Sequence, residues 1–115
     1  MISISDHETI YVWSEPVDMR RGFNGLSAMV IESDLNLFDG ALFVFISKNR
    51  DRIKILTWTR GGLALWYKRL EKGRFPKLKI LGGEIQLKPD ELRLLLDGVN
   101  PMSIKRPAVW EPYAS

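Results

Sequence analysis

Two strand-like segments flank a glycine pair in the middle of the chain, and this arrangement constrains the fold more than any other feature. Residues 52–60 (RIKILTWTR) and 63–71 (LALWYKRLE) resemble strands, and Gly61 and Gly62 between them tolerate positive φ. An antiparallel hairpin is the simplest connection for such a pair. Because side chains alternate along a strand, one face of the first segment carries Arg52, Lys54, Leu56, Trp58 and Arg60. We therefore predict a hairpin with its basic side chains along one side.

The remaining sequence predicts two helices and three further strands. Strands are expected at residues 9–14, 41–47 and 84–88; the second is apolar at every position but the last, as in a strand covered on both faces. Helices are expected at 21–32 and 90–97. We predict a single α+β domain over residues 1–115, with a mostly antiparallel sheet of four or five strands and two main helices. Its core spans about residues 9–99, and 100–115 form an extended tail that packs only at Val109 and Trp110.

Composition restricts the class of protein. The 115 residues are 45% hydrophobic, enough for one domain that buries over ~60% of its unfolded surface. There is no cysteine, so neither a disulfide nor a thiolate zinc site is possible. No apolar run approaches the ~18 residues of a membrane span, and the start lacks a signal peptide pattern. We expect a cytoplasmic protein that makes no contact with a membrane.

Charge is strongly segregated along the chain. Residues 48–79 contain eleven Lys or Arg and two acids, a net charge of +9, whereas the rest of the chain carries six basic and twelve acidic residues. A surface of this kind attracts polyanions, because neutralising phosphates releases their counterions. The competing explanation is edge protection, since Lys and Arg on an outer strand discourage sheet-to-sheet pairing.

Contact with DNA is expected from the basic residues of this block and of the turn before the first helix. They are Arg20, Arg21, Lys48, Arg50, Arg52, Lys54, Arg60, Lys68, Arg69, Lys72 and Arg74. Three aromatic residues are interleaved with them, namely Trp58, Trp66 and Tyr67. These rings either stack on unpaired bases or contact a partner, or they belong to the core, which is the commoner place for Trp and Tyr in strands.

The segment DMRRG, residues 18–22, allows two interpretations. In the first, Arg20 and Arg21 lie on an exposed turn and hold a phosphate or a partner carboxylate. In the second, Asp18 caps the following helix and an arginine pairs with an acid of the fold. Gly22 and Gly25 lower helix propensity, which indicates either a late helix start or a close backbone approach.

Enzyme chemistry is poorly supported by the sequence. The one histidine, His7, has no positioned partner, and no GK[ST] follows the glycines to form a phosphate loop. The carboxylates are scattered, so we expect no catalytic residue, metal ion or cofactor. A metal-dependent enzyme would become credible if the fold brought Asp18, Asp39 and Asp51 into one pocket.

Three stretches carry a family resemblance: VDMRRGFNGL, LFVF and NRDRIKILTWTRGGLALWYKRLEKGRF. In this order they resemble the accessory proteins, called TnpB or Orf2-like, encoded beside the transposase in the insertion sequence 66 family. The family patterns DMR(R/K)GF(D/N)GL, DR(I/V)K(I/V)L and KRLExGxF fall on residues 18–26, 51–56 and 68–75, and the similarity spans about residues 10–98. The chain departs from the family at Thr59, where Asp is usual, and at Pro76-Lys77, near which Trp-Pro is common.

This resemblance implies an accessory role in DNA transposition, separate from the strand-cutting transposase. Combined with the charge, it predicts a non-enzymatic protein that binds DNA at the element ends through residues 48–79. The alternative is an adaptor that binds the transposase without touching DNA, with the basic segment against an acidic surface.

Overall fold

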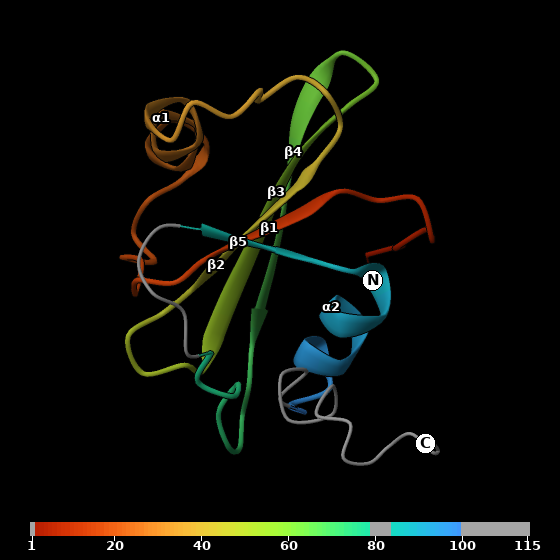
Figure 1. Cartoon of the computed structure of the whole chain (residues 1–115). Helices are drawn as coiled ribbons and strands as arrows, with labels where there is room; N and C mark the ends of the chain where they lie inside the picture. Colours follow the sequence, from red (N-terminus) through yellow and green to blue (C-terminus); the bar gives the residue numbers. More distant parts are fainter. Residues whose placement is uncertain (1, 79–83, 100–115) are drawn as a thin grey trace.

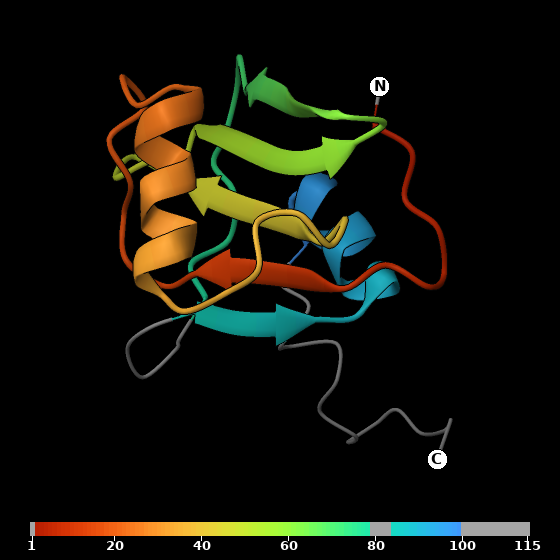
Figure 2. The ribbon, with the colours of Figure 1, turned by 90° about the horizontal axis from the view of Figure 1, so that it is seen from above.

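The computed structural model describes residues 2–78 and 84–99, which form a five-stranded sheet with one helix on each face (Figures 1 and 2). The elements are β1 (Ile10–Trp13), α1 (Phe23–Glu32), β2 (Leu42–Ile46), β3 (Arg52–Thr59), β4 (Gly62–Arg69), β5 (Glu84–Leu87) and α2 (Pro89–Leu96). The predicted fold class, the five strands and both helices are confirmed.

The strands lie in the order β4-β3-β2-β1-β5. β1 and β2 are parallel and are connected through α1, whereas the other three neighbouring pairs are antiparallel. β2 is therefore central, and all five of its residues are buried, as its apolar sequence predicted.

Alternation along the strands divides the apolar side chains between two cores. The core on the α1 side includes Trp13, Leu26, Val30, Phe43, Phe45 and Leu56. The core on the α2 side includes Ile10, Val12, Val44, Ile53, Ile55, Phe75, Leu92 and Leu95. Both faces of the sheet are thus occupied by packed apolar side chains.

The hairpin of β3 and β4 is confirmed, but its turn lies one residue earlier than the glycine pair indicated. Thr59 pairs with Gly62, so the two-residue loop consists of Arg60 and Gly61. Arg60 has φ 49° and Gly61 has φ 83°, the left-handed values that a type I′ turn requires at both central positions. Gly62 already belongs to β4.

α1 starts late, with Gly22 as its N-cap and no side-chain hydrogen bond to the cap. The prediction that Asp18 caps this helix is wrong, because its carboxylate accepts hydrogen bonds from Arg20 instead. A Cβ on Gly25 would lie 3.2 Å from the side chain of Arg21, so this glycine lets the Arg21 stem approach the helix. Of the two alternatives expected from these glycines, the late helix start is the one confirmed.

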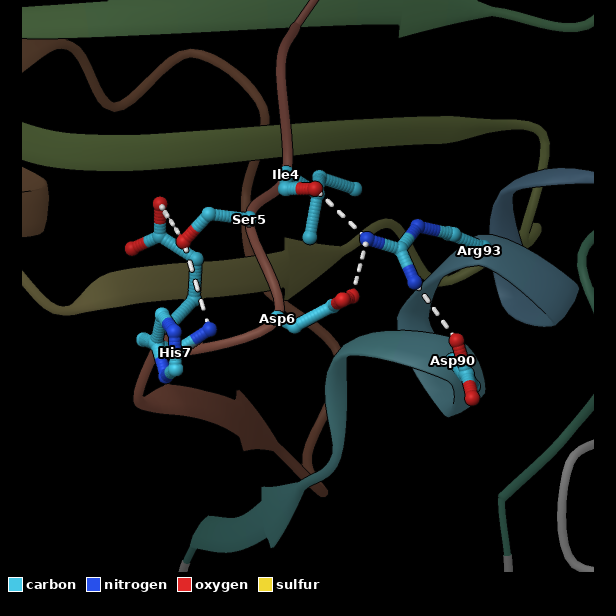
Figure 3. A network of polar contacts seen from close by, with 7 residues as sticks. Ile4, Ser5, Asp6, His7, Asp90 and Arg93 are labelled. Carbon is cyan, nitrogen blue, oxygen red and sulfur yellow. Dashed lines mark hydrogen bonds and ion pairs between the residues drawn. The ribbon is translucent and has the colours of Figure 1, made fainter.

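The N-terminal segment is attached to α2 by the guanidinium of Arg93 (Figure 3). This group donates hydrogen bonds to the carbonyl oxygen of Ile4 at 2.6 Å and to Asp6 at 3.1 Å, and it also pairs with Asp90. The Ile4 side chain packs against the α2-side core. Residues 4–6 and α2, which are far apart in the sequence, are thereby held together.

Within residues 2–78 and 84–99, neither helix has the length and apolar composition needed to cross a bilayer. The predicted tail with its anchors Val109 and Trp110 lies outside the described residues.

The turn geometry predicts opposite outcomes for two adjacent substitutions. Gly61→Ala places a Cβ at φ 83° and should lower the free energy of unfolding by about 1 kcal/mol. Gly62→Ala, in a strand with no atom within 4 Å of the new Cβ, should leave stability unchanged or slightly raised. Urea unfolding followed by tryptophan fluorescence measures both, and equal losses would contradict the assigned turn.

Candidate nucleic-acid interface

Three loop segments meet at one end of the sheet and form what we call the basic end, defined as residues 14–22, 47–52 and 69–78. These residues include nine Lys or Arg and four acids, a net charge of +5. The segments surround the ends of β1, β2 and β4 and lie in the left half of Figure 2. Sequence alone predicted a basic face along one hairpin, whereas the structure gathers the charge from three loops.

Backbone hydrogen bonds hold these segments together. The N–H of Val17 donates to Ile46 at 2.9 Å, which attaches the first segment to the end of β2. The N–H groups of Leu70 and Phe75 donate to Asp51 at 2.7 Å and to Arg50 at 2.6 Å, so the chain after β4 returns beside the turn between β2 and β3. Lys72 and Arg74 on this returning segment are exposed, as is Lys48 on the turn between β2 and β3.

Phe75 anchors this returning segment. Its ring is fully buried in the α2-side core, and its carbonyl oxygen accepts a hydrogen bond from the Arg50 guanidinium at 3.2 Å. The sequence analysis did not predict this return. The one signal for it was a large aromatic residue directly before Pro76, at the end of a charged run.

Two adjoining clefts open at the basic end. One, with a volume of about 550 Å³, is lined by Asp18, Arg20, Lys48, Asp51 and Arg52, among others. The other, of about 850 Å³, is lined by Trp13, Glu15, Arg50 and Lys77, among others. They share Pro16, Ser47 and Lys48. Lys77 belongs to the predicted basic block but was not among the predicted contacts.

Lys54 is the clearest departure from the predicted basic surface. It is only 7% exposed, and its ammonium donates hydrogen bonds to the carbonyl oxygens of Met19 and Arg21, both at 2.8 Å. The same ammonium lies 4.8 Å from the centre of the Tyr67 ring, in a cation–π contact. The expectation that Lys54 faces DNA is wrong, because α1 and the loop before it cover this part of β3.

Asp18 and Arg20 form a local pair inside the basic end. The Arg20 guanidinium donates to both carboxylate oxygens, and the Arg20 backbone N–H donates to one of them at 2.9 Å. The guanidinium lowers the pKa of the Asp18 carboxyl from 3.8 to about 2, and the backbone hydrogen bond contributes further. A lowered pKa means that this pairing persists above pH 3.8 and is lost as pH falls through about 2.

The structure separates some of the predicted basic residues from the rest. Arg60 lies at the hairpin turn, at the opposite end of β3 from Arg52, about 23 Å away for a strand of this length. Lys68 pairs with Ile53, so it faces the α2 side, whereas Arg69 faces the α1 side with its cross-strand partner Arg52. The basic end brings together the other predicted contacts: Arg20, Arg21, Lys48, Arg50, Arg52, Arg69, Lys72 and Arg74.

The three aromatic candidates have different environments. Trp66 packs against the α2-side core, and Trp58 is partly buried with its ring 5.1 Å from that of Phe38. Tyr67 is 50% exposed, next to the basic end. Core packing thus accounts for Trp66, and Tyr67 is the ring best placed to contact a ligand.

Asp18, Asp39 and Asp51 do not meet in one pocket. Asp18 and Asp51 line the same cleft, but Asp39 lines a separate small pocket beside His7 and Glu8. Among residues 2–78 and 84–99, no group of three or more His, Asp or Glu is placed to hold a metal ion.

Comparison with known proteins assigns residues 8–106 to the family described as IS66 Orf2 like protein. The uncharacterised protein y4jC of Sinorhizobium fredii is 37% identical over 113 residues, which cover 97% of each chain. The uncharacterised protein y4hO of the same organism is 35% identical over 102 residues, 87% of this chain and 88% of that protein. No solved structure gives a significant match.

The position of Lys54 predicts that its ammonium stabilises the loop before α1. Lys54→Met keeps the stem but leaves two carbonyl oxygens without their donor, and it should lower the free energy of unfolding by about 1–3 kcal/mol. Lys48→Met, at an exposed position of the same end, should change it by less than about 0.5 kcal/mol. Urea unfolding compares the two variants, and equal stabilities would contradict the structural role of Lys54.

Proposed function

This chain belongs to the IS66 Orf2-like family, whose members are accessory proteins of DNA transposition, and we propose that it binds DNA at the element ends through its basic end. In this proposal the protein has a non-enzymatic role beside the transposase of the same element.

The concentration of positive charge at the basic end is the observation that supports direct DNA binding. Nine basic residues against four acids gather there, although the whole chain carries a net charge of only +3. Two of the acids, Asp18 and Glu71, already pair with Arg20 and Arg69. Edge protection explains little of this pattern, because seven of the nine basic residues lie in loops and Arg69 alone belongs to the edge strand β4.

The arrangement favours contact with the DNA backbone over base reading. Lys48, Lys72 and Arg74 are exposed on neighbouring loops, so their side chains are free to reach separate phosphates. The hairpin tip, the part of a two-stranded ribbon that would enter a groove, carries one cation, Arg60. We therefore expect affinity that depends on salt and only weakly on sequence.

Two exposed aromatic residues next to the basic end favour the transposase as a second partner. Tyr67 is 50% exposed and Phe23, directly after the first basic-end segment, is 47% exposed. Aromatic residues beside charges are typical anchors of protein interfaces. An adaptor that binds the transposase alone would use the same surface.

DNA binding through the basic end predicts different effects for two matched arginines. Arg74→Gln should weaken binding to duplex DNA and make the log–log salt slope shallower by about 0.9, the share of one phosphate contact. Arg60→Gln removes the same charge from the opposite end of the hairpin and should leave affinity and slope nearly unchanged. Fluorescence anisotropy with labelled element-end and unrelated duplexes, at several salt concentrations, measures both quantities.

Three other outcomes have distinct meanings. A wild-type affinity that does not change with salt would rule out phosphate contacts. Equal losses of DNA affinity in Arg74→Gln and Arg60→Gln would mean that the basic end is not the contact surface. If DNA binding is absent and the transposase still co-purifies after nuclease digestion, the adaptor is the correct function.

A further inference from the structure

We propose that Arg52 and Arg69 together hold one phosphodiester group of the DNA backbone, as a two-arginine clamp at the basic end. The inference rests on the proposed function and adds a defined ligand group to it. Three observations support it: the pairing of like charges, the unmet hydrogen-bonding capacity of Arg52 and the fixed surroundings of the pair.

The two arginines are direct cross-strand partners in the register of β3 and β4. Directly opposite side chains on antiparallel strands have Cβ atoms roughly 5 Å apart, and like charges in that position destabilise the sheet. They lie on the same face as Lys54, whose register partner is Tyr67. The Lys54 ammonium has its own partners, so the uncompensated repulsion is between Arg52 and Arg69, and an anion placed between these two would offset it.

Arg52 has a donor that nothing in the described chain satisfies. Its Nε is buried and makes no hydrogen bond, and its guanidinium forms no ion pair with any acid of residues 2–78 and 84–99. A buried polar group without a partner is costly and uncommon in folded proteins. Guanidinium and phosphate match as bidentate partners, so a phosphate bound by Arg52 would give this donor an acceptor once the side chain turns toward the cleft that it lines.

The surroundings of Arg52 restrict what its guanidinium can bind. Both acids of the cleft that it lines already have partners: Asp18 is held by Arg20, and Asp51 accepts a hydrogen bond from the Ser47 hydroxyl at 3.2 Å. The backbone N–H of Arg52 also donates to that hydroxyl, at 3.1 Å, which fixes the start of β3. The backbone at the base of the clamp is therefore fixed, and neither acid of this cleft forms an ion pair with Arg52.

Arg69 is the exposed half of the clamp. Its side chain is 60% exposed, and its contact with Glu71 is a surface ion pair at 3.2 Å. Such pairs contribute little to stability, so Arg69 can exchange Glu71 for a phosphate at small cost. Arg52 and Arg69 would then both donate hydrogen bonds to the same phosphate from adjacent strands.

Charge-conserving substitutions test the clamp, because lysine keeps the charge and loses the planar fork. Arg52→Lys and Arg69→Lys should each weaken binding to a duplex oligonucleotide about tenfold at fixed salt, with the salt slope nearly unchanged. Arg74→Lys, at an exposed loop position, should bind like the wild type. Unfolding midpoints are measured for each variant. If Arg52→Lys does not fold, the DNA affinity of Arg69→Lys, a change at an exposed position, tests the clamp.

The results separate the clamp from the proposed function. If all three lysine variants bind like the wild type while Arg74→Gln weakens binding, DNA binding stands and the clamp is wrong. Equal losses in Arg74→Lys and Arg52→Lys would also overturn it, because they would show no special geometry at the pair. A titration with inorganic phosphate at constant ionic strength tests whether the pair binds free phosphate instead of the phosphodiester groups of DNA. Phosphate binding that Arg52→Lys abolishes, with DNA affinity unchanged, would assign the site to free phosphate and overturn the clamp.

Discussion

The contact of one buried lysine with the loop before α1 is the interaction on which the basic end depends. Lys54 donates hydrogen bonds to Met19 and Arg21, and thereby fixes residues 18–22 against β3. Arg20, in this segment, lines the same cleft as Arg52. The ammonium has carbonyl oxygens and the Tyr67 ring as its partners, so a charge in the middle of the basic block serves the fold instead of a ligand.

Coverage of both faces of the sheet determines where the remaining charge can lie. α1 and α2 pack on opposite faces, and the central strand β2 is buried throughout. Charged residues of the strands are consequently displaced to the strand ends and to the loops beyond them. The return of the chain at Phe75 adds a third loop to that end, because its buried ring holds the preceding cations against the turn before β3.

Much of the fold was predictable from local patterns, and the site was predictable only in part. The apolar run of β2, the alternation of β3 and β4 and Pro89 at the start of α2 each indicated the correct element. Alternation could not show that α1 covers the Lys54 face, since that depends on the crossover between β1 and β2. Arg60 and Lys68 were grouped with the other cations by charge, although strand length separates Arg60 from Arg52 and alternation places Lys68 and Arg69 on opposite faces. The return at Phe75 depends on backbone hydrogen bonds between distant residues, for which the sequence carries no periodic signal.

The central claim is that DNA is bound at the end of the sheet where three loops meet. Backbone amide chemical shifts of the ¹⁵N-labelled protein, recorded during titration with unlabelled duplex DNA at low salt, test it most directly. The account predicts that the largest shift changes fall in residues 47–52 and 69–78, with little change at Arg60 and Gly61 or in α2. Changes centred on the hairpin tip or on α2, or no changes at all, would contradict it.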